Sequence, residues 1–156
     1  EYPALPAYEE AFMELLAYYL NQAGFEVNIT KLDDAGISEF GYAGKHNILN
    51  MGWISRDPSV LSYVYLSDNI EGGNQSAYSR FRNARLDEIL KTAPQTSDAD
   101  QRKALYEEAQ MIIMENAIAL PIHTYGNVYL AAKNVKGFRF DPEGYPYFYE
   151  ISLAAE

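Results

Sequence analysis

The stretch Asn50-Met51-Gly52-Trp53-Ile54-Ser55-Arg56-Asp57-Pro58 contains the only tryptophan of the chain. A short apolar run precedes it, and a segment that can form a helix follows from Asp57. Asp57 can cap that helix with its carboxylate, and Pro58 has the fixed φ that suits a first helical residue. The stretch therefore brings the end of a strand, an aromatic side chain and the start of a helix to one place. Such a junction is suited to presenting side chains to a ligand. The alternative interpretation of the same residues is a tryptophan buried in the core beside an ordinary helix cap.

The composition is that of a globular protein and excludes several classes of partner. The 156 residues, 48% of them hydrophobic, suffice for one domain with its own core. A net charge of -10 argues against nucleic-acid binding and against anionic membrane surfaces. The lack of cysteine excludes disulfides and thiolate metal sites, and no apolar run reaches the ~18 residues of a membrane span. Because no signal peptide or initiator methionine precedes Glu1, we expect a processed or excised piece.

Apolar residues at three- and four-residue spacings predict helices over 6–23, 83–92 and 98–116, with a further helix from Pro58 to Leu66. Gly24 ends the first helix, and Asp98 followed by Gln101 matches a capping pattern. The positions expected to face the core are Leu86, Ile89, Leu90, Leu105, Ala109, Ile112 and Ile113.

Alternating and short apolar runs predict strands over 25–30, 46–52, 119–123 and 128–131, the last two separated by a turn at Gly126-Asn127. Residues 33–42 are expected to form a short helix or an irregular connection, and residues 69–79 a loop. Helices that alternate with strands are typical of an α/β fold with a partly parallel sheet.

The residues that could carry catalysis are few. His46 and His123 lie far apart without zinc-ligand spacing, and no nucleophile elbow is present. Asp33-Asp34 could be the acid and base of a glycosidase, or an ordinary solvated helix cap. These patterns indicate neither an enzyme nor a required cofactor or metal.

The residues suited to ligand binding lie around Trp53. The Arg56 guanidinium could bind a carboxylate or stack on an aromatic ring, or it could form a surface pair with a neighbouring acid. Tyr63, Tyr65, Tyr78 and Phe81 could line a groove, and core packing is an alternative for Tyr65 and Phe81.

Several motifs in a fixed order resemble one family. They are Gly52-Trp53, Asp57-Pro58, a loop with Asn74, Ser79-Arg80-Phe81-Arg82-Asn83-Ala84-Arg85-Leu86-Asp87, Leu120-Pro121-Ile122 and Val135-Lys136-Gly137-Phe138. Their order and spacing over nearly the whole chain resemble the C-terminal part of the extracellular solute-binding proteins of family 5. Members of this family include the peptide, dipeptide and nickel receptors of ABC importers.

The resemblance implies an α/β fold, namely the C-terminal lobe of a type II periplasmic-binding-protein-like fold with a mixed sheet flanked by helices. Residues 1–125 would form this second lobe. Residues 126–156 would form the hinge return, near Tyr125 to Val128, and a tail that packs on a first lobe absent from this chain. We therefore expect exposed aromatic residues in the tail, such as Tyr145, Tyr147 and Phe148.

The resemblance also implies a function without catalysis: solute capture for an ABC importer, with the ligand held in a cleft between two lobes. The expected ligand-binding residues are Trp53, Ser55 and Arg56, with Asn50 and Asn74 as weaker candidates. The expected partners are a small solute (peptide or oligosaccharide), an ABC permease in the membrane and the first lobe of the same protein, without nucleic acid. The expected location is periplasmic or extracellular, where a lipid anchor on the full-length protein is compatible with the sequence.

The sequence departs from the peptide receptors at one position. In those receptors an acidic residue shortly after the tryptophan pairs with the amino group of the peptide, whereas the third residue after Trp53 is Arg56. This difference favours a sugar-like or anionic solute, because Trp53 can stack on a ring and Arg56 can pair with an acid. A peptide receptor remains open, as does a small carbohydrate-active enzyme that uses Asp33 or Asp34.

Overall fold

The computed structural model describes residues 6–53, 55–72, 76–122, 124 and 128–154, with the backbone alone at residues 6–9 and 34. Contacts divide the chain into two units, Glu1–Glu39 and Phe40–Glu156, and each is described by itself. Among the described helices, none combines the length and apolarity that crossing a bilayer requires.

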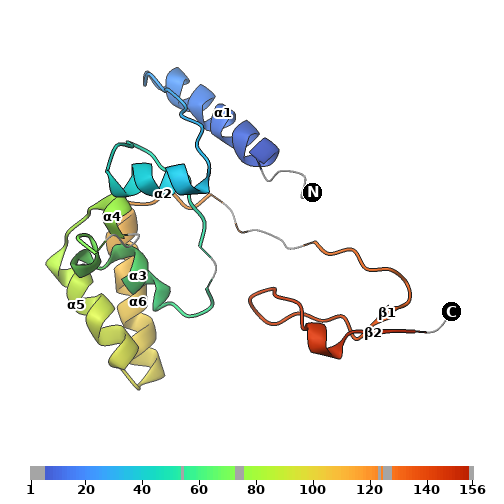
Figure 1. Cartoon of the computed structure of the whole chain (residues 1–156). Helices are drawn as coiled ribbons and strands as arrows, with labels where there is room; N and C mark the ends of the chain where they lie inside the picture. Colours follow the sequence, from blue (N-terminus) through green and yellow to red (C-terminus); the bar gives the residue numbers. More distant parts are fainter. Residues whose placement is uncertain (1–5, 54, 73–75, 123, 125–127, 155–156) are drawn as a thin grey trace. The chain divides into compact units, whose positions relative to one another are not determined.

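The first unit consists of helix α1, Pro6–Gln22, and an unpaired extended segment (Figure 1). The helix ends where the sequence predicts, because Gly24 adopts a φ of +93° that other residues rarely adopt. Within the apolar stripe of α1, Phe12, Leu16 and Leu20 are half-buried, whereas Leu15 and Tyr19 are exposed. The described part of this unit therefore covers the stripe only in part.

Helix α2, Asp34–Tyr42, crosses the boundary between the two units. The Asp33 carboxylate accepts a hydrogen bond from the Gly36 N–H at 2.8 Å. This bond satisfies one of the free N–H groups at a helix start. The short helix expected over 33–42 is confirmed.

The second unit begins with a group of short helices. They are α3 (Val60–Tyr65), η1 (Ser67–Asn69), α4 (Ser76–Ser79), α5 (Ala84–Thr92), η2 (Ala93–Gln95) and α6 (Ala99–Glu115). Helix α5 packs against both α6 and α3, and α3 packs against α4 (Figure 1). The helices predicted over 83–92 and 98–116 are confirmed within one residue at each end.

Side-chain caps fix where the two longest of these helices begin. The Asn83 side chain accepts a hydrogen bond from the Leu86 N–H at 3.0 Å, and the Asp98 carboxylate accepts one from the Gln101 N–H at 2.8 Å. Both are N-cap geometries, and the second was expected from the sequence.

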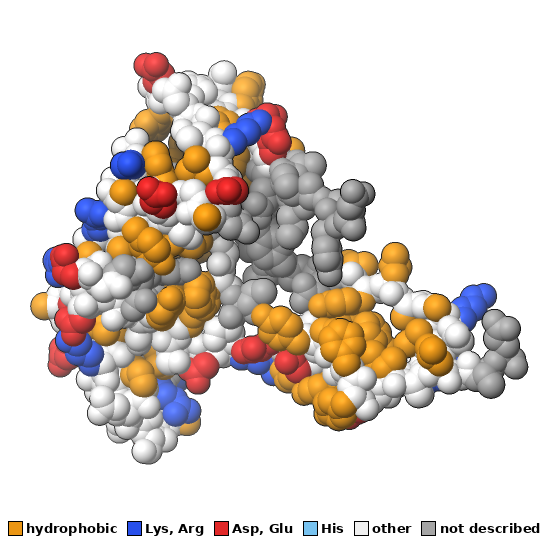
Figure 2. Space-filling model, viewed as in Figure 1, with side chains coloured by type: hydrophobic (Ala, Val, Ile, Leu, Met, Phe, Trp, Pro, Cys, Tyr) orange, Lys and Arg blue, Asp and Glu red, His pale blue; other side chains and the backbone are white. Residues whose placement is uncertain are grey.

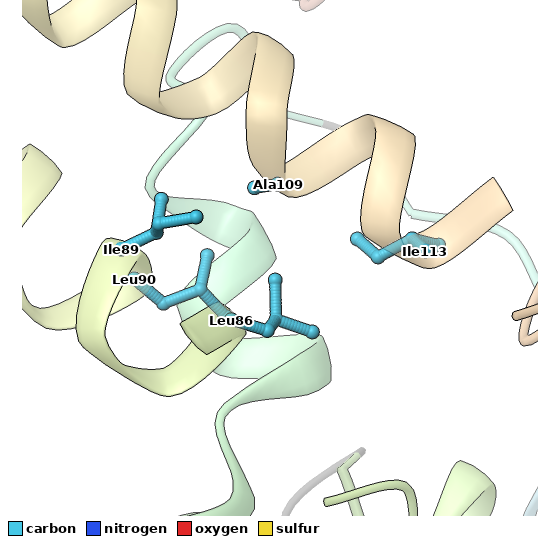
Figure 3. Packing of buried hydrophobic residues seen from close by; sticks show 5 residues of the cluster. All are labelled: Leu86, Ile89, Leu90, Ala109 and Ile113. Atoms are coloured by element: carbon cyan, nitrogen blue, oxygen red, sulfur yellow. The ribbon is translucent and has the colours of Figure 1, made fainter. Parts of the chain in front are cut away.

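The core lies between α5 and α6. Figure 3 shows Leu86, Ile89 and Leu90 of α5 facing Ala109 and Ile113 of α6. Partly buried apolar residues surround this cluster: Leu61, Tyr65, Leu66, Phe81, Leu105, Ile112, Ile118 and Ala119. The sequence periodicity identified the buried stripes of both helices correctly.

Replacing Asp98 by alanine is expected to lower the free energy of unfolding by about 1 kcal/mol, because the Gln101 N–H loses its acceptor. Urea unfolding followed by circular dichroism measures the change. Asp98→Asn is the matched control, since asparagine keeps an acceptor at this position and should remain close to the original stability. Equal losses in both variants would show that the cap does not stabilise α6.

The strands differ from the prediction. In the described part of the chain the only ladder joins β1, Val135–Lys136, to β2, Ser152–Leu153, antiparallel. The strands expected over 25–30, 46–52 and 128–131, and over the described residues 119–122, form no ladder there. The helices with a small sheet fit an α/β class, whereas the mixed sheet flanked by helices is not seen. Extended segments need hydrogen-bonding neighbours, and none pairs with them among the residues that the structure describes.

The tail from Val128 is held by its own contacts. Gly137 has a φ of +72°, and a Cβ there would lie 2.1 Å from the Glu150 carbonyl oxygen, so only glycine allows the close approach beside the ladder. Tyr129, Phe138 and Phe140 pack against one another with ring centroids 4.3–6.0 Å apart. The tail thus has a small aromatic cluster of its own.

Much apolar surface of the tail stays exposed, and Figure 2 shows apolar side chains gathered over it. Tyr145 and Phe148 are exposed, as expected from the sequence. Tyr147 is only partly exposed, because the Arg139 guanidinium lies 4.6 Å from the centre of its ring.

Candidate functional site

Trp53 is neither a core residue nor a fully solvated one. Its side chain is 49% exposed, and its ring lies 5.0 Å from that of Tyr63 at an interplanar angle of 36°. Tyr63 projects from α3, so the short helix after Pro58 supplies the aromatic support. The interpretation of Trp53 as a buried tryptophan is therefore wrong for this structure, and one face of the indole remains available for contacts.

A second aromatic pair joins α2 to α4. The rings of Tyr42, at the end of α2, and Tyr78, in α4, are 4.9 Å apart. A hydrogen bond to the Tyr78 side chain raises the pKa of Tyr42 to about 12, with smaller contributions from burial and from the nearby Tyr63 hydroxyl. We call Tyr42, Trp53, Tyr63 and Tyr78 the aromatic wall.

The backbone near Tyr42 and Tyr78 lies close to neighbouring side chains. A Cβ on Gly41 would lie 2.7 Å from the Tyr78 ring, so a larger residue would displace that ring. Arg80, with a φ of +51°, donates from its guanidinium to the Tyr42 carbonyl at 2.6 Å. His46 Nε2 lies 3.1 Å from the Tyr78 carbonyl oxygen. These contacts tie α4 to the end of α2 and fix the positions of both tyrosines.

The other aromatic candidates near the glycine-rich loop serve the core. Tyr65 and Phe81 pack against the α5–α6 cluster, which confirms the alternative of core packing for these two. Burial raises the pKa of the Tyr65 phenol. Tyr63 and Tyr78, by contrast, belong to the aromatic wall.

Ser55 and Asp57 stabilise a turn before α3. The Ser55 hydroxyl donates to the Asp57 carbonyl at 3.1 Å, and the Asp57 carboxylate accepts from the Ser59 N–H at 2.8 Å. Hydrogen bonds from Ser59 lower the pKa of Asp57. The prediction that Asp57 caps the helix directly is wrong by two residues, because α3 starts at Val60 and Asp57 stabilises the turn that leads into it.

Among the described residues, Arg56 makes no cation–π contact with Trp53. It lines a shallow pocket of about 230 Å³ together with Ser55, Pro58 and Leu61. Its backbone N–H lies 3.4 Å from a carboxylate oxygen of Glu143, and its guanidinium forms no ion pair within the described residues. Within the described residues the guanidinium is occupied by neither an acid nor an aromatic ring.

The two asparagine candidates remain predictions. Asn50 is exposed and makes no hydrogen bond with the described part of the chain. Asn74 lies outside the described residues.

Sequence reasoning missed a larger hollow on the surface of α6. It has a volume of about 580 Å³, and its lining includes Asp57, Arg102, Lys103 and Glu107. The two acidic and two basic side chains of the lining give it no net charge. Charged residues such as Arg102 and Lys103 are common on exposed helix faces, so their spacing does not reveal a hollow from the sequence.

A catalytic site is not assembled in the described part of the chain. Asp33 caps α2, as the alternative of an ordinary cap predicted, and it makes no contact with a second acid there. No group of three His, Asp or Glu side chains suited to a metal ion occurs among the described residues.

Comparisons with known proteins identify the family. No family model matches the chain. The chain is 31% identical over 133 residues to the dipeptide-binding protein of Pseudomonas aeruginosa, which covers 83% of this chain and 24% of that protein. Di/tripeptide-binding protein 1 of the same species is 34% identical over 114 residues, with 70% and 20% covered. The chain belongs to the family 5 solute-binding proteins.

Relatives of this solute-binding protein bind different ligands. Heme-binding protein A of Haemophilus influenzae is 33% identical to it over 121 residues, which cover 76% of this chain and 19% of that protein. The chain spans about a fifth to a quarter of the length of the three relatives. The relatives are named for dipeptides, di/tripeptides and heme, so membership supports solute capture without catalysis and leaves the solute open.

Proposed function

We propose that this chain is the second, C-terminal lobe of a receptor that captures a solute for an ABC importer. Residues 1–125 form the lobe, and residues 126–156 form the hinge return and the tail. The solute lies in a cleft between this lobe and a first lobe, and hinge motion closes the two around it. The half-exposed Trp53, supported by Tyr63, is the observation that carries the proposal, since it presents an aromatic face on a fixed framework.

The exposed tail supports a two-lobed protein. Side chains such as Leu130, Phe148 and Leu153 are largely exposed in this chain, and contiguous apolar surface of this kind usually meets a partner. In our proposal this partner is the first lobe of the same protein. The receptor acts in the periplasm or outside the cell, passes its solute to an ABC permease and requires no cofactor.

Arg56 supports a solute that is anionic or sugar-like. Its guanidinium has no ion-pair partner in the described part of the chain, and charge-assisted hydrogen bonds to a carboxylate are among the strong polar contacts. The Asp57 carboxylate, the nearest acid in sequence, is held by the Ser59 N–H in the turn. Part of its acceptor capacity is therefore used within the turn.

Isothermal titration calorimetry on the full-length receptor with trialanine, N-acetyl-dialanine and maltotriose tests both the function and the specificity. N-acetyl-dialanine keeps a carboxylate and lacks a free amino group. We expect N-acetyl-dialanine or maltotriose to bind at least as tightly as trialanine. Tight binding of trialanine alone would contradict the specificity, and a protein that binds none of a wider peptide and sugar panel would contradict the function.

The Arg56→Ala variant is expected to bind N-acetyl-dialanine about 10- to 100-fold more weakly, because a charge-assisted hydrogen bond contributes about 1.5–3 kcal/mol. Arg82→Ala is the matched control, since Arg82 is also exposed and, among the described residues, forms an ion pair with the exposed Glu71 alone. Its affinity should stay unchanged. Equal affinities in the Arg56→Ala variant and the original protein would exclude Arg56 from the site.

A further inference from the structure

The larger hollow on the surface of α6, which we call the α6 hollow, has a buried phenol in its lining. Tyr106 is 5% exposed and is the only buried residue among the described residues of this lining. Its hydroxyl has no hydrogen-bond partner among the described residues, and it is not one of the fully enclosed polar atoms there. The hydroxyl therefore reaches the hollow and remains free to bond a ligand.

Two opposite charges in the lining are not neutralised within the protein. Asp57, from the turn before α3, and Arg102, from α6, form no ion pair with each other or with any other described residue. Lys103 and Glu107, by contrast, pair with each other at 3.6 Å. The charges left for a ligand are thus one carboxylate and one guanidinium.

Both of these charged groups keep unused hydrogen-bonding capacity and act on the phenol. Among the described residues only Ser59 donates to the Asp57 carboxylate, which can accept about four hydrogen bonds. The Arg102 guanidinium makes one long hydrogen bond of 3.5 Å, to the Thr96 carbonyl oxygen. Burial raises the pKa of Tyr106, the Asp57 carboxylate adds to this rise, and the Arg102 guanidinium opposes it. The phenol is thus subject to both charges.

We propose that the α6 hollow binds a small zwitterion, an α-amino acid, in addition to the solute of the cleft. The ligand carboxylate bonds to Arg102 and accepts from the Tyr106 hydroxyl, while its ammonium group bonds to the Asp57 carboxylate. The volume of about 580 Å³ suits a small molecule. An anion alone would be repelled by Asp57 and a cation alone by Arg102, so a ligand with both charges matches this lining best. Apolar lining residues can contact an aliphatic side chain of the ligand: Pro58, Pro94 and Ala99.

The α6 hollow adjoins the smaller pocket at Arg56 and can be tested apart from it. The two share Asp57, Pro58 and Gln110, but Arg56 lines only the smaller pocket and Arg102 only the larger hollow. Substitutions of the two arginines therefore address the two sites separately.

Saturation-transfer difference NMR on the full-length receptor tests the inference with L-valine, N-acetyl-L-valine and L-valinamide. N-acetylvaline lacks the ammonium group, and valinamide lacks the carboxylate. We expect valine to bind with a Kd on the order of 1 mM and each analogue to bind at least about 10-fold more weakly, because each has lost one charge-assisted contact. Binding of either analogue as tight as that of valine would overturn the zwitterion.

Four variants assign the contacts. Arg102→Gln should weaken valine binding about 10-fold, and Tyr106→Phe about 3- to 10-fold with unchanged unfolding stability. Asp57→Asn keeps an acceptor for the turn and should remove the advantage of valine over N-acetylvaline. Lys103→Gln is the matched control, because Lys103 lines the same hollow but is already paired with Glu107, and it should change the Kd less than about 2-fold. Equal losses in Arg102→Gln and Lys103→Gln would overturn the inference.

The same titrations on receptor saturated with the tightest solute of the peptide and sugar panel separate this site from the cleft. Valine binding that persists, and that falls in Arg102→Gln but not in Arg56→Ala, supports the α6 hollow. Valine that the solute displaces, and that Arg56→Ala no longer binds, would lie in the cleft, which overturns this inference while the receptor function stands. A protein that binds valine through Arg102 but no solute of the panel would overturn the receptor function and support the α6 hollow.

Discussion

Replacing Leu90 by alanine is expected to lower the free energy of unfolding by about 2–5 kcal/mol. Leu90 is 1% exposed and belongs to the cluster between α5 and α6. Truncation removes buried methyl and methylene groups and leaves a cavity that the two helices cannot close without shifting. Urea unfolding followed at 222 nm gives the change. A loss of this size is a large part of the stability of a typical domain.

Leu130→Ala is the matched control for this effect. When this chain is unfolded without the first lobe, the substitution removes the same atoms from a side chain that is 97% exposed, so its expected effect on the chain alone stays within about 0.5 kcal/mol. A Leu90→Ala variant as stable as the Leu130→Ala variant would show that the α5–α6 cluster does not hold the fold together.

Replacing Trp53 by alanine is expected to weaken solute binding by the full-length receptor about 30- to 1,000-fold. Tryptophan at the centre of a binding surface commonly contributes 2–4 kcal/mol on truncation, and each 1.4 kcal/mol is tenfold in affinity. Trp53 is half-exposed and packs on Tyr63, so its ring is both accessible to a ligand and held in position. Calorimetry with the tightest solute of the peptide and sugar panel measures the loss.

Trp53→Phe keeps an apolar ring at the same position and should lose less affinity than Trp53→Ala. The unfolding free energies of both variants decide between two roles. Unchanged affinity together with a large fall in stability would make Trp53 a structural residue of the full-length protein and remove it from the site.

The sequence predicted the helices well because their signals are local. Asn83 and Asp98 are good cap residues, and the apolar period of 3.6 places Leu86 and Ile113 on the facing sides of two helices. The strands were different. The alternation over 25–30 shows that two faces differ in polarity, but it carries no information on which segment will pair with it. Within the described residues the segment is extended and pairs with no strand.

The candidate site was only partly predictable for the same reason. Trp53 stands out in the sequence because it is the only tryptophan, and Tyr63 and Tyr78 were noted because they lie near the glycine-rich loop. Tyr42 was missed. It sits at the end of a short helix, and its contact with Tyr78 depends on Gly41, whose role appears only when α4 is placed beside it.

The pairing of α5 with α6 has a consequence for how the protein is made. These two helices follow each other in the chain and bury the most completely enclosed side chains, so the core requires only the closure of a short loop. Contacts of such low sequence separation form fast, and nascent proteins fold from the N-terminal end as they leave the ribosome. The helical hairpin can therefore assemble while the tail is still being synthesised, and the exposed aromatic residues emerge onto a nucleus that already exists.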